Sequence, residues 1–147
     1  MKRVKPAKKL SDIDAAYLAG IVDGEGCITA SLNRGYINGR LEIGSVNREF
    51  LQSLVDRVGT GTFCAAGRRS KNAKILYRWH IQLGAMPSLL PQLLPYLKLK
   101  KAQAEMMLAL VRYSSCPSVV NLTDSFQIET LNNFRRLNQR GEAILSN

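Results

Sequence analysis

The sequence predicts an α+β domain in which helices cover one face of a four-stranded antiparallel sheet. Four short segments alternate apolar and polar residues, and they form two pairs that are each joined by a polar turn. Segments with apolar residues three and four apart stand before, between and after these pairs. The expected element order is therefore α-β-β-α-β-β-α-α-α, in a single domain over residues 1–147.

The first helix is expected to begin after Ser11, because Ser11 and Asp14 have the spacing of a capping box. We expect Ser11 to be the N-cap and Asp14 to reach back to it. The helix should end in the glycine-containing residues 24–26, because glycine releases the chain from helical geometry.

Alternation predicts the strands and apolar periodicity predicts the later helices. The strands are expected at residues 27–33, 40–45, 62–67 and 75–83. The later helices are expected at residues 48–58, in a short proline-punctuated stretch ending near Tyr96, at 99–113 and at 124–139. Asn47 can cap the helix that follows it, and Trp79 is expected in the core rather than stacked on a base.

The chain carries 21 Lys and Arg against 11 Asp and Glu, a net charge of +10. This charge favours a polyanionic partner, with nucleic acid first. Residues 2–9 hold five of the basic residues and a proline. We expect them to form a flexible arm that either contacts DNA or is simply solvated.

The same composition argues against several other classes. Three scattered cysteines without a CxxC pair are typical of reduced thiols in an intracellular protein. We expect no signal peptide and no membrane span. His80 is the one histidine, so hydrolysis would have to rest on carboxylates, lysine and metal.

The predicted sheet has a polar face that a +10 protein is expected to lay on DNA, because a two-stranded ribbon fits the major groove. A solvated face is the alternative. The side chains expected on this face are Thr29, Ser31, Asn33, Asn38, Arg40, Glu42, Thr62, Arg78, His80 and Gln82.

Two kinds of DNA contact are expected. Arg40 and Arg78, on strands, are placed to read guanine edges, while Glu42 would accept from cytosine or orient Arg40. Residues in the loop between the third and fourth strands would hold phosphates, which position the protein without reading sequence. These are Arg68, Arg69, Lys71 and Lys74.

Residues 18–26, LAGIVDGEG, resemble the LAGLIDADG motif of homing endonucleases. Ile21, Val22 and Glu25 are conservative replacements, and Gly24 stands where the motif has alanine. The outright matches are Leu18, Ala19, Gly20, Asp23 and Gly26. Residues 94–100, LPYLKLK, resemble the segment that brings a basic residue to that family's active site. The resemblance covers roughly residues 10–113 and implies an α-β-β-α-β-β-α core with a saddle-shaped sheet and extra C-terminal helices.

Small residues four apart share one face of the motif helix and would let two helix backbones come close. Packing within the same chain is the alternative. Because the motif occurs once, a two-fold homodimer would supply the second copy. The expected interface residues are Ala16, Ala19, Gly20, Asp23 and Gly24.

Such a dimer would place two Glu25 carboxylates near the axis, each at a helix C-terminus where the dipole disfavours negative charge. Divalent cations would relieve this repulsion. The resemblance implies that Glu25 binds the metal, with the Gly24 carbonyl as a second ligand, and that Asp23 is a helix-end or interface residue. The expected ion is Mg²⁺ or Mn²⁺, with Ca²⁺ supporting DNA binding without cleavage.

The resemblance also implies further active-site residues. Lys100 would lie near the scissile phosphate, with Lys98 as its neighbour and possible substitute. Ser45 and Asn47 are the two candidates for a polar residue between the second strand and the second helix, and Arg48 is a candidate phosphate contact.

The function that the resemblance implies is site-specific double-strand cleavage of a long, near-palindromic duplex DNA, which promotes intron mobility. A maturase that binds intron RNA and a non-catalytic DNA-binding regulator are the alternatives. The expected location is the cytoplasm or nucleoid of a prokaryote, or an organelle.

Overall fold

The expected order of helices and strands is confirmed by the computed structural model, which describes residues 3–33, 36–114 and 125–138, without the side chains of 32–36, 113–114 and 125–127. The elements are α1 (Asp12–Glu25), β1 (Gly26–Asn33), β2 (Tyr36–Ser45), α2 (Arg48–Val58), β3 (Thr62–Gly67), β4 (Leu76–Gln82), a 3-10 turn (Leu83–Ala85), α3 (Met86–Leu93), α4 (Lys101–Ser114) and α5 (Ser125–Asn138).

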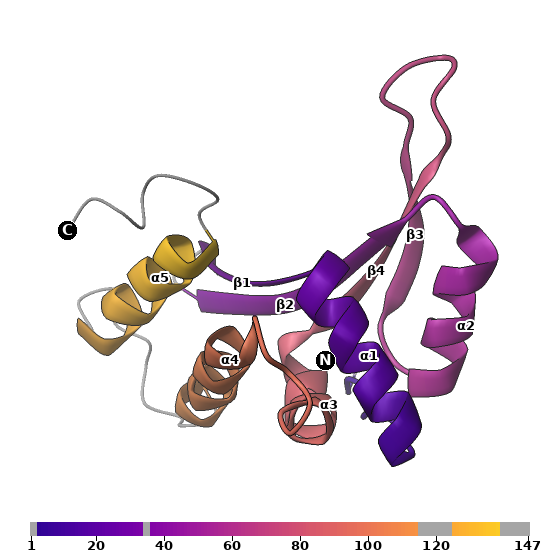
Figure 1. The fold of residues 1–147 in the computed structure, drawn as a ribbon. Coiled ribbons are helices and arrows are strands. Elements are labelled where there is room, and N and C mark those ends of the chain that lie inside the picture. The colour runs from indigo at the N-terminus through magenta and orange to yellow at the C-terminus, as the bar shows by residue number, and fades with distance from the viewer. Residues whose placement is uncertain (1–2, 34–35, 115–124, 139–147) are drawn as a thin grey trace.

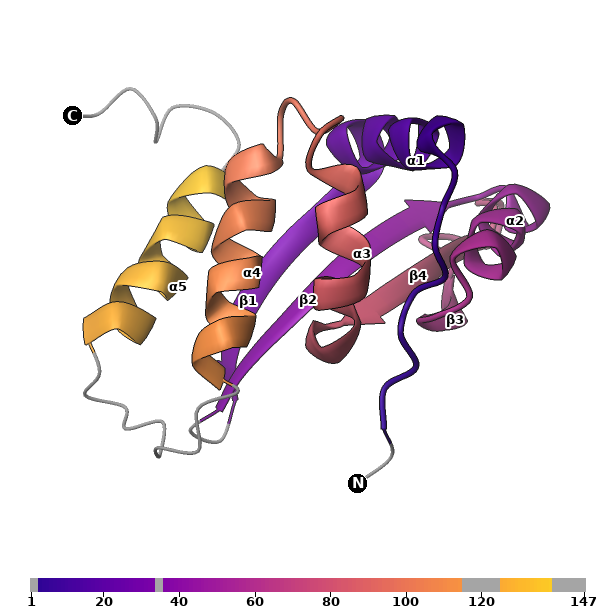
Figure 2. The same ribbon diagram turned by 90° about the horizontal axis from the view of Figure 1, so that it is seen from below.

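The strands form one antiparallel sheet in the order β1-β2-β4-β3. The sheet curves, and its lower face in Figure 1 is covered by α1, α3 and α4. Seen from below, α3 and α4 lie in front of β1 and β2, and α5 lies beside α4 (Figure 2). No described helix covers the upper face, above which the β3–β4 hairpin projects (Figure 1).

Alternation along the strands separates a core face from a polar face, as predicted. The side chains of Ile28, Leu41, Ile43, Trp79 and Ile81 are at most 1% exposed and pack into the common core. Burial of each contributes about 1.5–3 kcal/mol. Trp79 lies in the core, as expected, where its indole N–H donates to the carbonyl of buried Thr60 at 3.0 Å.

The Ser11 cap is confirmed, because its hydroxyl oxygen accepts from the backbone N–H of Asp14 at 3.1 Å. The Asp14 carboxylate, expected to reach back to Ser11, instead accepts from Arg57 on α2. At the other end, α1 runs directly into β1 at Gly26, where a Cβ would lie only 2.8 Å from the Val22 carbonyl oxygen.

The described residues 3–10, expected to form a flexible basic arm that contacts DNA or is solvated, are held against their own domain by hydrogen bonds from the backbone. The backbone N–H groups of Ala7 and Leu10 donate to Ser88 and Gln92 on α3, at 2.8 and 2.7 Å. The N–H of Lys8 donates to the carbonyl of Val58, at 2.8 Å. The segment crosses the helical side of the molecule (Figure 2), so its charge lies away from the open face of the sheet. The composition of this segment indicated its positive charge, but it did not indicate the hydrogen bonds to Ser88, Gln92 and Val58, which are distant in sequence.

Some boundaries differ from those expected. β2 begins at Tyr36, inside the predicted turn, because pairing with β1 extends to the Asn33–Tyr36 pair. α4 begins at Lys101 rather than at residue 99, because residues 98–100 bind α1 instead. The turn residues 34–35, and residues 115–123 in the gap expected between the last two helices, lie outside the described residues.

Candidate active site and nucleic-acid interface

Glu25 is the last residue of α1, and its side chain is exposed. The next residue, Gly26, pairs with Ile43 on β2, so the end of α1 lies beside the last residues of that strand. Glu25 therefore presents a carboxylate to solvent where the motif helix meets the sheet, the position from which the resemblance predicts metal binding.

Asp23 is occupied within its own chain. One carboxylate oxygen accepts from the backbone N–H of Lys98 at 2.8 Å, and the other from those of Leu99 and Lys100 at 3.1 and 2.9 Å. Three consecutive peptide donors thus converge on one carboxylate, which is the geometry of a backbone anion nest. Asp23 is a helix-end residue that docks the segment before α4. Both oxygens of its carboxylate already accept hydrogen bonds within one chain.

Lys100 reaches the same end of α1 with its side chain. Its amine donates to the carbonyl oxygens of Val22 and Asp23, at 3.0 and 2.7 Å. The cation offsets the partial negative charge at the helix C-terminus. The Lys100 amine therefore binds the last turn of α1, two residues before Glu25, whereas the neighbouring Lys98 is exposed.

The same segment also lies near the start of α1. The Tyr96 hydroxyl lies near the Asp12 carboxylate, and desolvation together with the Asp12 charge raises the pKa of Tyr96 above its ordinary value of 10.0. Residues 96–100 therefore lie along α1, from near its first residue to its last turn.

Ser45 and Asn47 have local partners. The Asn47 side chain accepts from the N–H of Phe50 and caps α2, as predicted, and the Ser45 hydroxyl oxygen accepts from the N–H of Asn47, both at 3.0 Å. Arg48 lies with its guanidinium 5.8 Å from the Phe63 ring centroid, a cation–π contact. These contacts account for the three side chains structurally, and a catalytic or phosphate-binding role for them remains a proposal.

The exposed face of α1 is apolar or small. Ile13 and Tyr17 are 81% and 55% exposed, and Ala16, Gly20 and Gly24 share their side of the helix. A Cβ built on either glycine would meet nothing within 4 Å. This chain's own packing therefore does not require glycine at either position.

One expected interface residue is corrected by its burial. Ala19 has no exposed surface and packs in the core with Leu18 and Val22, on the opposite side of α1. Spacing along the motif did not distinguish it from Ala16, but the position of the helix on its own domain does.

Glu42 is the centre of the polar sheet face. His80 Nδ1 lies 3.0 Å from its carboxylate, Arg78 Nη1 lies 3.4 Å away and Arg40 Nε 3.8 Å away. Oε2 of Glu42 is buried and has no aligned hydrogen-bond donor among the described residues. This oxygen cannot easily reach a base, so the geometry favours Glu42 as a residue that orients its cationic neighbours over one that accepts from cytosine.

The other predicted contacts flank this cluster. Strand register aligns Cys27, Glu42, His80 and Thr62 in one row, and Thr29, Arg40 and Gln82 in the next. Ser31 and Asn38 are paired and exposed further along, and the side chain of Asn33 lies outside the described residues.

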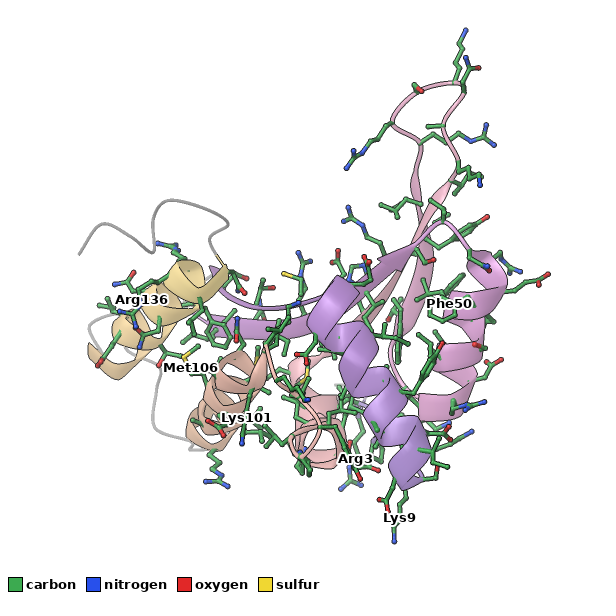
Figure 3. All side chains as sticks on the ribbon, viewed as in Figure 1. Arg3, Lys9, Phe50, Lys101, Met106 and Arg136 are labelled. Carbon is green, nitrogen blue, oxygen red and sulfur yellow. The ribbon has the colours of Figure 1, made fainter. Side chains whose placement is uncertain are left out.

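The β3–β4 loop is basic and exposed to solvent. Nitrogen-tipped side chains project from it in Figure 3, above the open face of the sheet. A groove of about 500 Å³ lies at its base. Basic residues lining the groove are Arg68, Arg69, Lys74 and Arg78, and Lys71 is exposed in the loop.

Two features were not anticipated from sequence: the docking role of Asp23 and the contacts of Glu42 with Arg78 and His80 on β4. For Asp23 a signal existed, since a carboxylate in the last turn of a helix opposes the dipole unless donors lie nearby. For Glu42, the contact with Arg40 two residues away was expected, whereas the contacts with Arg78 and His80 depend on the register of β2 against β4.

One chain by itself carries few metal ligands. Among residues 3–33, 36–114 and 125–138 no three His, Cys, Asp or Glu side chains cluster closely enough to hold an ion. Glu25 and the Gly24 carbonyl form a hard-oxygen donor set that suits a divalent cation, but an incomplete one. A second copy of the same donors would complete it.

In the described part of the chain, no helix is both long and apolar enough to span a membrane.

Comparisons with known proteins agree with this geometry. The chain is 30% identical over 145 residues to DNA endonuclease I-CreI of Chlamydomonas reinhardtii, covering 87% of this chain and 84% of that protein. It shares the fold of the homing endonuclease I-CvuI, crystallised with its target in the presence of calcium (TM-score 0.67, 24% identity, 89% and 85% of the two chains covered).

A second solved structure with this fold is the archaeal intron-encoded homing endonuclease I-Vdi141I in complex with DNA (TM-score 0.70, 15% identity, 89% and 87% covered). The chain matches no protein-family profile.

Proposed function

Since this chain belongs to the LAGLIDADG family of homing endonucleases, we propose that it cleaves both strands of a long, near-palindromic DNA site as a divalent-metal-dependent homodimer. The observation that carries the proposal is the end of α1, where exposed Glu25 lies beside a lysine held in place by main-chain contacts. In keeping with the relatives, we propose that cleavage promotes mobility of an intron, in whichever compartment holds the target DNA: a prokaryotic nucleoid or an organelle.

The homodimer is supported by the two sides of α1. Ala15, Leu18, Ala19 and Val22 are buried on one side, and Ile13 and Tyr17 are exposed on the other. A helix that is apolar all round is normally buried all round. Gly20 and Gly24 leave that second side flat, which suits close contact with the same helix of a second copy. The interface that we propose comprises Ile13, Ala16, Tyr17, Gly20 and Gly24.

Such a dimer would bring together two Glu25 carboxylates and two Gly24 carbonyls, completing the oxygen donor set that one chain lacks. A Mg²⁺ or Mn²⁺ ion held there would neutralise charge on the scissile phosphate and lower the pKa of water. Lys100 would place its cation where negative charge develops during phosphodiester hydrolysis. Glu25 is thus the metal-binding residue and Lys100 the electrostatic one.

The DNA substrate is supported by the polar face and hairpin. Arg40 and Arg78 lie on neighbouring strands, 60% and 42% exposed, and are oriented by Glu42. Arg side chains so placed can read guanine edges in the major groove. The basic hairpin loop would hold phosphates and fix the register of the protein on DNA.

The decisive experiment selects a duplex from a randomised library and measures its cleavage with Mg²⁺. We expect cuts at one near-palindromic site, and a loss of about a thousandfold or more in the Glu25→Gln variant with binding retained. Ca²⁺ should support binding without cleavage. Glu105→Gln, which alters an exposed carboxylate on α4, is the matched control and should cleave like the wild type.

Two results would contradict the proposal. If the wild type binds one site but does not cut it with Mg²⁺ or Mn²⁺, the protein is a DNA-binding regulator. If it cuts no duplex, and binds intron RNA equally before and after Glu25→Gln, it is a maturase.

A further inference from the structure

We propose that Asp23 is a positioning residue of the active site, whose carboxylate fixes residues 98–100 against the end of α1 and thereby sets the place of the Lys100 amine. The inference rests on the proposed function in assigning Lys100 a part in cleavage. The inference also has a purely structural part, namely that Asp23 determines where Lys100 lies. That part rests on contacts within one chain.

The bonds to Asp23 are numerous and of a strong kind. Its carboxylate accepts three hydrogen bonds from consecutive peptides, at 2.8, 3.1 and 2.9 Å. Hydrogen bonds to charged acceptors are the stronger ones in proteins. The bonds span 75–77 residues of sequence, so they join two segments that covalent geometry leaves independent.

The charge of Asp23 lies between two helix ends. A carboxylate in the last turn of α1 opposes that helix dipole. The same carboxylate lies beside the start of α4, whose first turn is closed by the bond from the Ala104 N–H to the Lys100 carbonyl. Negative charge is favourable at a helix N-terminus. Asp23 thus joins the C-terminal end of α1 to the N-terminal end of α4.

Both ends of Lys100 are held by the same turn of α1. Its peptide N–H donates to the Asp23 carboxylate at 2.9 Å, and its amine donates to the Asp23 and Val22 carbonyls at 2.7 and 3.0 Å. The side chain is half-buried, unlike that of Lys98. A long, flexible lysine is therefore confined within two residues of Glu25.

Asparagine at position 23 would break this arrangement with little change in shape. An amide has one oxygen acceptor and one nitrogen donor, whereas the carboxylate offers both oxygens as acceptors. Leu99 and Lys100 donate to one oxygen of Asp23, and Lys98 donates to the other. The amide nitrogen would therefore face at least one peptide N–H, and the segment would lose its fixed position.

The test is a double-mutant cycle on the single-turnover cleavage rate, using the full chain, Mg²⁺ and the duplex recovered by selection. We expect Asp23→Asn to slow cleavage by about a hundredfold, because small displacements of a catalytic group have effects of this size. DNA affinity should change less than threefold. Lys100→Met should slow cleavage at least as much, and the double variant should be no slower than Lys100→Met.

The cycle separates positioning from general structural damage. If Asp23 acted only on folding or dimerisation, its effect would multiply with that of Lys100→Met, and the inference would be overturned. Asp56→Asn, on the exposed surface of α2, is the matched carboxylate control and should cleave like the wild type.

Amide hydrogen exchange tests the structural part without cleavage. Asp23→Asn should speed exchange at Lys98, Leu99 and Lys100 by tenfold or more, while buried amides of α2 keep their protection. Unchanged exchange at these three residues would overturn the inference, whether or not the protein cleaves. A wild type that fails to cleave while exchange responds as expected would instead contradict the proposed function and leave Asp23 as the residue that places Lys100.

Discussion

The end of α1 and the open face of the sheet are both polar, but they are built from different contacts. At α1, the Asp23 carboxylate and the Lys100 amine bind main-chain N–H and C=O groups. On the sheet, the Glu42 carboxylate lies against other side chains, those of His80, Arg78 and Arg40.

Main-chain N–H and C=O groups are present whatever the side chains, whereas a cluster of side chains changes with each substitution. The main-chain contacts at the end of α1 therefore suit cleavage chemistry, which is the same at every phosphodiester bond. The side-chain cluster around Glu42 suits the reading of base edges, in which each side chain contributes separately. We therefore expect substitutions at α1 to affect cleavage of every target, and substitutions on the sheet to affect the choice among targets.

The largest effect is expected at the exposed face of α1. In Gly20→Leu the new side chain finds open space in its own chain, and a helix interior favours leucine over glycine by up to about 1 kcal/mol. The monomer should therefore keep its fold, but two helices could no longer approach closely. Sedimentation should show a monomer, and cleavage of any target should fall below detection.

Ala102→Leu, an equally exposed substitution on α4, is the control for added bulk and should remain dimeric. A Gly20→Leu protein that dimerises and cleaves normally would show that the partner lies elsewhere.

Substitution of Arg78 should change the choice among targets rather than abolish cleavage. Arg78→Ala removes one side chain from the Glu42 cluster and should relax preference at one base pair of each half-site by about 1–3 kcal/mol. Cleavage of a preferred site at saturating protein should change little. A profile of all single base-pair variants measures this, and a uniform loss across every position would make Arg78 a phosphate contact instead.

A smaller and uniform effect is expected at the hairpin loop. Lys71→Ala should weaken binding to all sequences alike and lower the slope of log Kd against log salt by about 1 for each phosphate that Lys71 neutralises. Titrations at several salt concentrations with a target and an unrelated duplex test this. A change confined to the target would assign Lys71 to base reading.

The smallest effect concerns Tyr96 and pH. Its raised pKa means that the folded state holds the phenol proton more tightly than the unfolded state does. This contribution to stability is complete below about pH 10 and is lost as pH rises through the folded value. Tyr96→Phe should remove that alkaline loss while leaving cleavage at neutral pH unchanged. Urea unfolding at pH 8 and at pH 11 measures the difference, and an identical pH dependence in the two proteins would contradict it.

Local pattern was enough for most of the fold. Alternation placed Ile28 and Ile43 on the core face and Thr29 and Glu42 on the polar face, because side chains in a strand point to opposite sides in turn. The caps at Ser11 and Asn47 were likewise visible, since a cap bonds to residues only two or three positions away. These interactions are local, and a single sequence encodes them directly.

The sequence by itself therefore determined the order of elements, the two faces of the sheet and the motif that ends at Glu25. The tertiary structure alone decided what the polar groups bind: Asp23 meets residues 98–100, Glu42 meets Arg78 and His80, and residues 3–10 lie along the helical side. Each of these contacts joins segments far apart in the chain, or on different strands. Their formation depends on how the core packs, which no local pattern of residues specifies.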